Sequence, residues 1–141
     1  MKRLGVITAA QYRAKATKAI SEETLHRRVA VYLGRVLRPP TIWSTFPSGG
    51  GGKMRGMRLR AMGLQAGWPD ILVLDLGSHL IGAVTVIGIE LKSKKGTLSP
   101  EQKTVQASFA LVGAKYEVAR SLDDVRDILE MYRVPMHARL S

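Results

Sequence analysis

The chain has no cysteine, so neither a disulfide bond nor a thiolate metal site can form in it. No apolar run is long enough to cross a bilayer, and the N-terminal residues do not show the apolar segment of a signal peptide. These absences are typical of a protein of the reducing cytoplasm, which is where we expect the chain to act.

Acidic residues are scarce in one half of the chain. Residues 1–69 contain 13 Lys and Arg but only two acids, Glu22 and Glu23, whereas residues 70–141 contain nine residues of each sign. The whole net charge of +11 therefore comes from the first half. Such an excess indicates a polyanionic partner, most often the phosphate backbone of nucleic acid. A merely solubilising surface is the alternative, and anionic lipid is less favoured because no strongly amphipathic basic helix is evident.

The size and composition predict one globular domain. The 141 residues are 45% hydrophobic, which is enough to bury a core. We expect a basic flexible arm over residues 1–20, a folded domain over residues 21–132 and a C-terminal tail over residues 133–141. The sequence shows no internal repeat and no second domain.

Capping residues, apolar spacing and turn residues predict an α/β fold in which helices flank a mixed central sheet. The unbroken apolar runs of the second and third strands also predict that both faces of these strands are buried. The expected elements are a helix after Ser21 that ends before Pro39, a strand over 41–46, a glycine-rich loop, a short helix over 54–64, strands over 71–76 and 83–91 joined by a turn, a helix over 100–112, a strand over 115–119 and a helix over 122–132.

Two short motifs lie at the ends of the second and third strands. A Gly-Trp-Pro-Asp motif ends at Asp70, and a Glu-Leu-Lys motif begins at Glu90. Glu90 and Lys92 are two residues apart on a strand, so both point to the same face of the sheet. If the two strands are neighbours, Asp70 and Glu90 can share one divalent ion, with the carbonyl of Leu91 as a further ligand. Hard carboxylate oxygens suit Mg²⁺ or Mn²⁺.

These groups match the needs of phosphodiester hydrolysis. A bound metal acidifies water and neutralises phosphate charge, while Lys92 can orient the water and stabilise the developing negative charge. Burying two carboxylates and an ammonium is costly unless they pair or bind a metal, which argues against a purely structural role. Either motif alone is common in turns and strand edges; the two in this order, in a basic protein, are not.

Two more polar residues are candidates for this site, and each has an ordinary structural alternative. Glu22 lies on the apolar stripe of the first helix and Glu23 lies off it, so we expect Glu22 to face the sheet. An acid in a first helical turn can also simply offset the helix dipole. Gln102 can close a capping box with Ser99, or it can return across the site on the helix that follows the Glu-Leu-Lys strand.

A run of four glycines precedes a basic segment with Lys53, Arg55, Arg58 and Arg60. A phosphate-binding P-loop is excluded, because Met54 stands where a Ser or Thr would bind Mg²⁺. We interpret the segment as a flexible loop and a basic helix that grip the nucleic-acid backbone. The alternative is a mobile surface hairpin.

The histidines and tryptophans show no functional spacing. His26, His79 and His137 lack the spacing of metal ligands, so we expect them on the surface or in packing roles. We expect Trp43 and Trp68 to anchor the core or a loop rather than to form base-stacking platforms.

These segments together resemble the VRR-NUC family of the PD-(D/E)XK, restriction-endonuclease-like nuclease superfamily. The resemblance extends over residues 21–132, and Ser48 and the longer glycine run depart from the family pattern in the loop before the basic helix. The matching residues are Ser21-Glu22 with Leu25 and Leu33, then Phe46-Pro47-Ser48-Gly49-Gly50, Gly63 to Asp70, Ile89 to Lys92 and Leu98 to Gln102.

The resemblance implies a core of order αβββαβ and Mg²⁺- or Mn²⁺-dependent cleavage of DNA. It assigns Asp70, Glu90 and Lys92 to the core catalytic motif, Glu22 to the helical acid and Gln102 to the downstream glutamine. Together with the carbonyl of Leu91, the three acids would bind the metal, and no nucleotide cofactor or membrane is implied.

The resemblance also bears on substrate and assembly. Small members without appended domains, often from phages, are similar to Holliday-junction resolvases and act as homodimers. We therefore expect a structure-selective DNA endonuclease in the cytoplasm of a bacterium or of a phage-infected cell. A flap, nick or nonspecific DNA nuclease is one alternative, and a non-catalytic basic DNA-binding module is the other.

Overall fold

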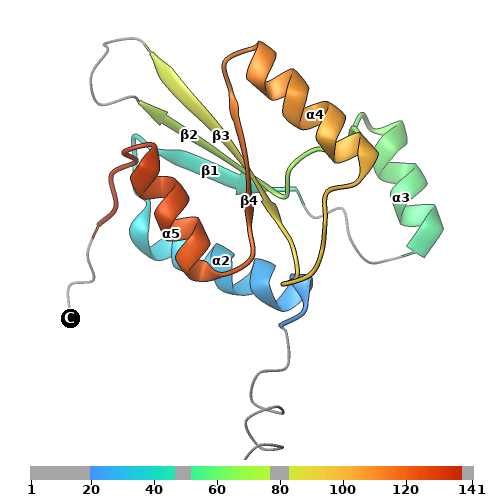
Figure 1. Ribbon diagram of the computed structural model, residues 1–141, viewed down its shortest axis with the longest axis horizontal. Coiled ribbons are helices and arrows are strands. Elements are labelled where there is room, and N and C mark those ends of the chain that lie inside the picture. Colours follow the sequence, from blue (N-terminus) through green and yellow to red (C-terminus); the bar gives the residue numbers. More distant parts are fainter. Residues whose placement is uncertain (1–19, 47–51, 77–82, 138–141) are drawn as a thin grey trace, which may run out of the picture.

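The computed structural model of the chain describes residues 20–46, 52–76 and 83–137. Each predicted helix and strand is present in the predicted order (Figure 1). The predicted arm, glycine-rich loop and turn between the second and third strands fall almost wholly outside the described residues. The elements are α2 (Glu22–Val36), β1 (Ile42–Thr45), α3 (Gly52–Ala61), β2 (Ile71–Leu76), β3 (Val84–Leu91), α4 (Pro100–Leu111), β4 (Lys115–Ala119) and α5 (Leu122–Met131).

The four strands form one mixed sheet in the order β1-β2-β3-β4. β2 is antiparallel to both β1 and β3, whereas β4 runs parallel to β3. A parallel neighbour requires a crossover connection, and α4 supplies it. The prediction of a mixed sheet flanked by helices is therefore confirmed.

One face of the sheet is covered by α2 and α5. Ser21 and Ser121 cap these helices by accepting hydrogen bonds from backbone amides in the first turn. Leu25, Val29 and Leu33 of α2 repeat at a spacing of four residues, so they form a single stripe that is buried in the core with apolar residues of α5 and of the strands. The predicted apolar stripe of the first helix is thus the face that packs on the sheet.

Among the elements that the structure describes, α4 covers the other face of the sheet. Ser99 and Gln102 form the predicted capping box at its start. Phe109 packs close to β3 because Gly88 has no side chain: a Cβ there would lie 2.7 Å from Pro69 and 2.9 Å from Phe109. The helix therefore sits directly on the strand that carries the Glu-Leu-Lys motif.

Part of this second face lies beyond the cover of α4. At the far end of the sheet, Ile42, Leu76 and Val84 are 57%, 50% and 56% exposed. The prediction that both faces of β2 and β3 are buried is therefore wrong at this end. An apolar run in the sequence shows what a strand can bury, but it does not show how far the covering helix extends.

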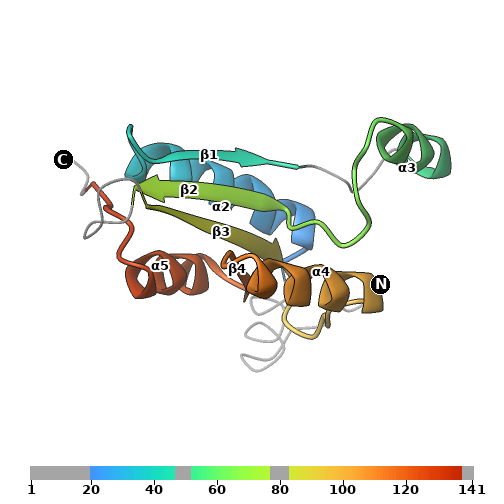
Figure 2. The same ribbon diagram turned by 90° about the horizontal axis from the view of Figure 1, so that it is seen from above.

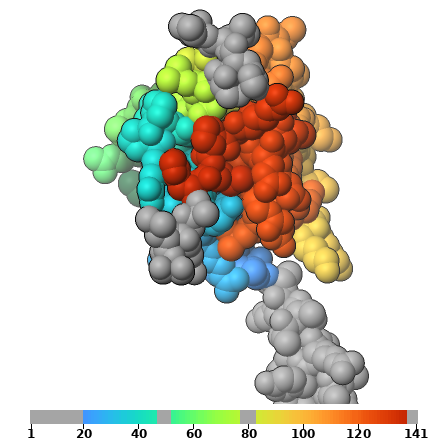
Figure 3. Space-filling view, turned by 90° about the vertical axis from the view of Figure 1, so that its left-hand side faces the viewer, coloured from blue at the N-terminus to red at the C-terminus, as the bar shows by residue number. Residues whose placement is uncertain are grey.

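The segment after α5 packs on the core. Val134 is buried, and the amide of His137 donates a hydrogen bond to the carbonyl of Val36 at 2.9 Å. The hydroxyl of Tyr32 also contacts the Met136 sulfur at 3.6 Å. In the space-filling view this segment lies against α2 and β1 (Figure 3). Residues 133–137, which the sequence analysis places in a C-terminal tail, thus pack against the core.

The basic helix α3 lies beyond the end of β1 and the start of β2, at one end of the sheet (Figures 1 and 2). Across its described range, Gly52–Ala61, no residue is buried. Along the described part of the chain, no helix is long and apolar enough to cross a membrane.

Candidate active site

The Gly-Trp-Pro-Asp motif is wedged between β3 and the start of α4. Gly67 has a φ of +85°, and a Cβ on it would lie 2.4 Å from the carbonyl oxygen of Glu101. Trp68 makes an edge contact with Phe109, and Pro69 fills the space above Gly88. These contacts fix the backbone that enters β2 at Asp70.

Asp70 lies opposite the Glu-Leu-Lys motif. In the pairing of β2 with β3, Ile71 is opposite Ile89, and continuing that register by one residue places Asp70 opposite Glu90. The Asp70 Oδ2 accepts a hydrogen bond of 2.8 Å from the amide of Leu91. The structure thus brings together the two carboxylates that the sequence motifs predict to be neighbours.

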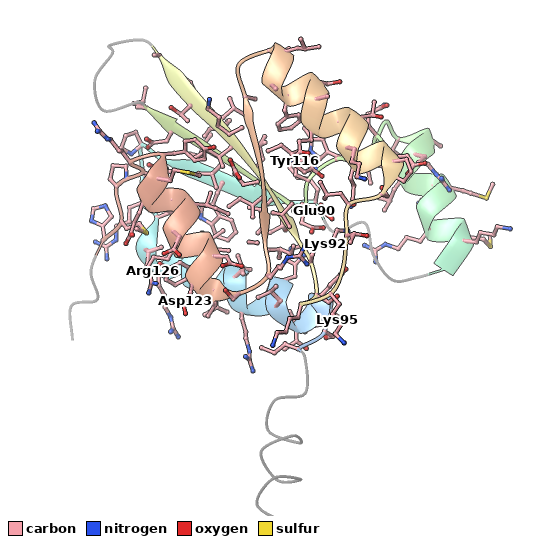
Figure 4. All side chains as sticks on the ribbon, in the orientation of Figure 1. Glu90, Lys92, Lys95, Tyr116, Asp123 and Arg126 are labelled. Atoms are coloured by element: carbon pink, nitrogen blue, oxygen red, sulfur yellow. The ribbon has the colours of Figure 1, made fainter. Side chains whose placement is uncertain are left out.

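Glu90 is almost completely buried, and one of its oxygens is held by two side chains. Its Oε1 accepts a hydrogen bond from Gln102 Nε2 at 2.6 Å and lies 3.2 Å from Lys92 Nζ. The Lys92 side chain is only 12% exposed. Figure 4 shows Glu90 and Lys92 close together at the centre of the molecule. The other oxygen, Oε2, is buried and has no hydrogen-bond partner within the described residues.

Gln102 fills both roles that its sequence position left open. Its backbone amide and its side-chain oxygen bond to Ser99 in the capping box, at 3.1 and 2.9 Å. Its side-chain nitrogen is then free to donate to Glu90. Helix capping and site geometry are therefore fixed by one residue.

The two acids at the start of α2 point in different directions. Glu22 Oε1 accepts a hydrogen bond of 3.2 Å from the amide of Ser93, directly after the Glu-Leu-Lys motif. Glu23 instead forms an exposed ion pair with Arg27 at 3.0 Å. Glu22 is the acid on the side of the site, as its place on the apolar stripe predicts.

The turn that carries Ser93 is held by Arg120, a residue that the sequence analysis missed. The Arg120 guanidinium donates to the carbonyls of Ser93 and Gly96 at 2.7 and 2.6 Å. No local pattern marks this arginine, because its partners lie more than twenty residues away in the sequence. It fixes the turn to which Glu22 is bound.

The two central carboxyl groups both resist ionisation. Burial raises the pKa of Glu90 to about 7, and the negative charge of Asp70 adds to this shift, while Lys92 opposes it. Burial also raises the pKa of Asp70, against the opposing effects of the Leu91 amide, His26 and Lys92. Carboxyl groups with strongly shifted pKa values are common in functional sites.

His26 is a second residue near the site that the sequence analysis assigned to an ordinary role. A positive charge on His26 lowers the pKa of Asp70, so the two side chains lie within electrostatic reach of each other. A spacing of four residues from Glu22 places both on one face of α2. That spacing was visible in the sequence and marks His26 as part of the surroundings of the site.

The donor set fits a divalent cation, although it is smaller than a full ligand sphere. Across the described residues, no cluster of three or more His, Cys, Asp or Glu is close enough to hold a metal. Asp70 and Glu90 nevertheless face each other, and the unpartnered oxygen of Glu90 is an anionic acceptor that a cation would satisfy. Because the Leu91 amide points to Asp70, the carbonyl of Leu91 points to the same edge of its strand.

The predicted DNA-binding residues Lys53, Arg55, Arg58 and Arg60 are all exposed on α3. Arg60 lines a cavity of about 200 Å³ together with Glu90 and Gln102, among others. The basic helix and the carboxylates therefore meet at the same end of the sheet.

The predicted anchoring roles of the two tryptophans fit the structure. Trp43 lies next to Gly34 of α2 on the core side. Trp68 joins Phe46 and Phe109 in a row of edge contacts, with ring centroids 6.1 and 5.3 Å apart. Trp68 is only half-buried, however, and part of its surface lines a cavity.

Comparison with known proteins gives a similarity of fold. No protein-family profile and no curated protein matches the chain. A solved structure of a "VRR_NUC domain protein" is similar with a TM-score of 0.61 and 21% sequence identity, over 82% of this chain and 89% of that one. This similarity confirms the fold that the sequence predicts, a restriction-endonuclease-like α/β core.

Proposed function

We propose that this chain is a nuclease of the VRR-NUC family, a metal-dependent endonuclease that hydrolyses phosphodiester bonds in DNA. The observation that carries the proposal is the convergence of Asp70, Glu90 and Lys92 at one end of the sheet, with a buried Glu90 oxygen that lacks a partner within the described residues. The fold shared with a VRR_NUC domain protein supports the proposal. A non-catalytic DNA-binding module would have no use for buried carboxylates whose charged forms the site disfavours.

The metal site is proposed from the oxygen donors of this end of the sheet. Asp70, Glu90 and the carbonyl of Leu91 would hold Mg²⁺ or Mn²⁺, and Glu22 would contribute from the first helix. When bound, such an ion supplies a water of lowered pKa and neutralises charge on the phosphate.

Lys92 and Gln102 perform separate tasks in this site. Lys92 Nζ lies 3.2 Å from Glu90 Oε1, so its charge is next to the place that the scissile phosphate would take. In that position it donates to a phosphate oxygen or to the attacking water and stabilises the charge of the transition state. Gln102 holds Glu90 Oε1 at 2.6 Å and thereby keeps the Oε2 atom available as a ligand.

DNA would be held by the basic first half of the chain and by α3. Contacts from lysine and arginine to phosphates fix the position of DNA but do not read its sequence. We therefore propose that selectivity depends on the shape of the DNA, as in a Holliday-junction resolvase. A flap, nick or nonspecific nuclease is the second candidate, because the same phosphate contacts serve those substrates.

The number of cuts that a four-way junction requires bears on the oligomeric state of the protein. Resolving a four-way junction takes two opposed cuts, and each chain has one Asp70–Glu90–Lys92 set. Two chains related by a two-fold axis supply both cuts, so we propose a homodimer that acts in the cytoplasm of a bacterium or of a phage-infected cell.

The test is a panel of labelled four-way junction, flap, nicked and linear DNA, incubated with the protein in Mg²⁺, in Mn²⁺ and in EDTA. We expect cleavage only with a metal and paired, symmetric nicks on the junction. Absence of cleavage on every substrate with either ion would overturn the nuclease assignment.

Sedimentation with and without junction DNA tests whether the protein is a dimer. A monomer that still cuts DNA would favour the flap or nick nuclease.

A further inference from the structure

An apolar cavity of about 500 Å³ lies between α3 and the segment that carries Trp68. Phe46, Leu59, Leu64 and Trp68 belong to its wall. The smaller cavity beside the carboxylates has the same four residues in its own wall, and it adds Glu90 and Gln102. The two spaces are therefore neighbours with a common wall. We call them together the α3 hollow; it runs from the candidate active site to the inner side of α3.

The wall of the α3 hollow has the chemistry of a surface for flat rings. Phe46 and Trp68 meet edge to face, with their rings at 79° to each other, and Phe109 makes a further edge contact with Trp68. Leu59 and Leu64 add aliphatic surface, and both are half-buried. An aromatic ring that is held in place by its neighbours and is partly exposed is a platform for base stacking. Any of the four bases can stack on it, because each has a flat π-face.

The rim of the α3 hollow carries positive charge. Arg55 and Arg60 belong to the lining, and Lys53 and Arg58 lie on the same helix, whose sequence contains no acid. Cations at the rim and an apolar wall inside match the two parts of a nucleotide, the phosphate and the base. A protein segment would gain nothing from this charge unless it were acidic.

The exposure of α3 suits a helix that gains its packing contacts from a bound ligand. A helix of ten residues is marginal in water when nothing packs on it, and no residue within Gly52–Ala61 is buried. Leu59 is the apolar residue of α3 that turns to the hollow, whereas Met54 and Met57 are 84% and 60% exposed. A ring held between Leu59 and Trp68 would join α3 to the rest of the protein.

We propose that the α3 hollow binds one unpaired nucleobase of a DNA strand whose scissile phosphate lies at Asp70 and Glu90. This inference rests on the proposed nuclease function and narrows its substrate class. DNA with an unpaired nucleotide next to the cut, as at a flap or a splayed junction, places a base in the hollow, whereas fully paired duplex DNA does not.

The first test uses the fluorescence of Trp68. The chain has two tryptophans, so Trp43→Phe leaves Trp68 as the single reporter. The probes are a duplex with a short single-stranded flap, the same flap with an abasic nucleotide beside the junction, and the fully paired duplex, all in EDTA. We expect saturable quenching by the flap and about tenfold weaker binding for the abasic flap. Trp68→Phe, which retains Trp43 on the core side, should show no quenching.

The second test fills the hollow from α3. Leu59→Trp should lower cleavage of the flap about tenfold, to the level of the abasic flap. Met57→Trp adds the same ring on the same helix outside the hollow, so it should behave as the wild-type protein. Because α3 buries no residue, both variants should keep the wild-type melting temperature.

The outcomes separate this inference from the proposed function. Equal quenching of Trp68 by the flap, the abasic flap and the paired duplex would overturn the proposal of a base site. Equal cleavage of the flap by Leu59→Trp and Met57→Trp would overturn it as well. Either result leaves the nuclease assignment intact if the wild-type protein cuts DNA. Quenching by the flap without cleavage of any substrate would instead overturn the nuclease assignment and keep the base site.

Discussion

Glu90 is the residue on which most of the site depends. It lies at the end of β3, opposite Asp70, and its Oε1 is shared by Lys92 and Gln102. Its Oε2 is buried without a partner within the described residues. A carboxylate in this setting is costly to keep charged, and a cation is the partner that would remove the cost.

The raised pKa of Glu90 predicts that stability depends on pH in the absence of metal. The ordinary pKa is 4.5 and the folded value is about 7, so between these values the folded protein binds more protons than the unfolded chain. The free energy of unfolding should therefore fall as the pH rises through this window, by up to a few kcal/mol. Glu90→Gln removes the titrating group and should reduce this slope.

Urea unfolding in EDTA from about pH 5 to about pH 8 measures how the free energy of unfolding depends on pH in the wild-type protein and in Glu90→Gln. Added Mg²⁺ should stabilise the wild-type protein more at the upper end of this range, because the ion competes with protons for the carboxylates. Equal slopes for the wild-type protein and the variant would show that Glu90 titrates normally.

Glu22 and Glu23 form a natural matched pair. Both lie in the first turn of α2, so replacing either by Gln removes the same interaction with the helix dipole. Glu22→Gln should lower metal-dependent cleavage by about 10- to 100-fold, because it changes a group at the edge of the metal site. Glu23→Gln should have no effect on the rate. Single-turnover cleavage measures the difference, and equal rates would remove Glu22 from the site.

At the scale of the elements, the site depends on how closely α4 approaches the Gly-Trp-Pro-Asp segment. Gly67 and Gly63 both have positive φ values, +85° and +101°, but a Cβ would meet the backbone of Glu101 only at Gly67. Gly63→Ala should cost about 1–2 kcal/mol of unfolding free energy from strain alone. Gly67→Ala should cost more, because the clash moves α4 away from β3.

Urea unfolding of the two glycine variants gives their stabilities, and cleavage assays show whether the site is intact. Displacement of α4 separates Gln102 from Glu90, so Gly67→Ala should also lose activity under conditions where it is still folded. Equal stability of the two variants would contradict the close packing described for Gly67.

The basic helix α3 is expected to contribute phosphate contacts. Replacing Arg55, Arg58 and Arg60 together by Ala should weaken DNA binding and lower the slope of log K against log salt by about 0.9 for each lost contact. A control that replaces Lys115 and Arg126, on β4 and α5, should leave the slope unchanged. Titrations without metal over a range of salt concentrations measure the slope, and an unchanged slope for the α3 variant would place this helix outside the DNA interface.

The sequence predicted the elements well because their signals are local. Ser99 and Gln102 mark the start of α4 within four residues, and the alternation that places Glu90 and Lys92 on one face is a property of any strand. The packing of Val134, the extent of the sheet that α4 covers and the bonds from Arg120 to the turn after β3 depend on contacts between distant segments. No single-sequence pattern carries that information.

Across the whole molecule, the two ends of the sheet differ in character. One end carries Asp70 and Glu90, the basic helix α3 and the α3 hollow, while the other exposes Ile42, Leu76 and Val84. The basic helix α3 therefore meets the carboxylates at a single end, where we propose that DNA and metal are bound together.

The most direct test of the site is single-turnover cleavage of labelled junction and flap DNA by Asp70→Asn and Glu90→Gln proteins in Mg²⁺. Asp127→Asn, at a position whose side chain is 66% exposed, is the matched control. We expect both site variants to keep the wild-type fold and to bind DNA in EDTA at least as tightly as the wild-type protein, because carboxylate–phosphate repulsion is reduced. Cleavage should be lost in both and unchanged in the control; wild-type turnover by either site variant would contradict the assignment of this site.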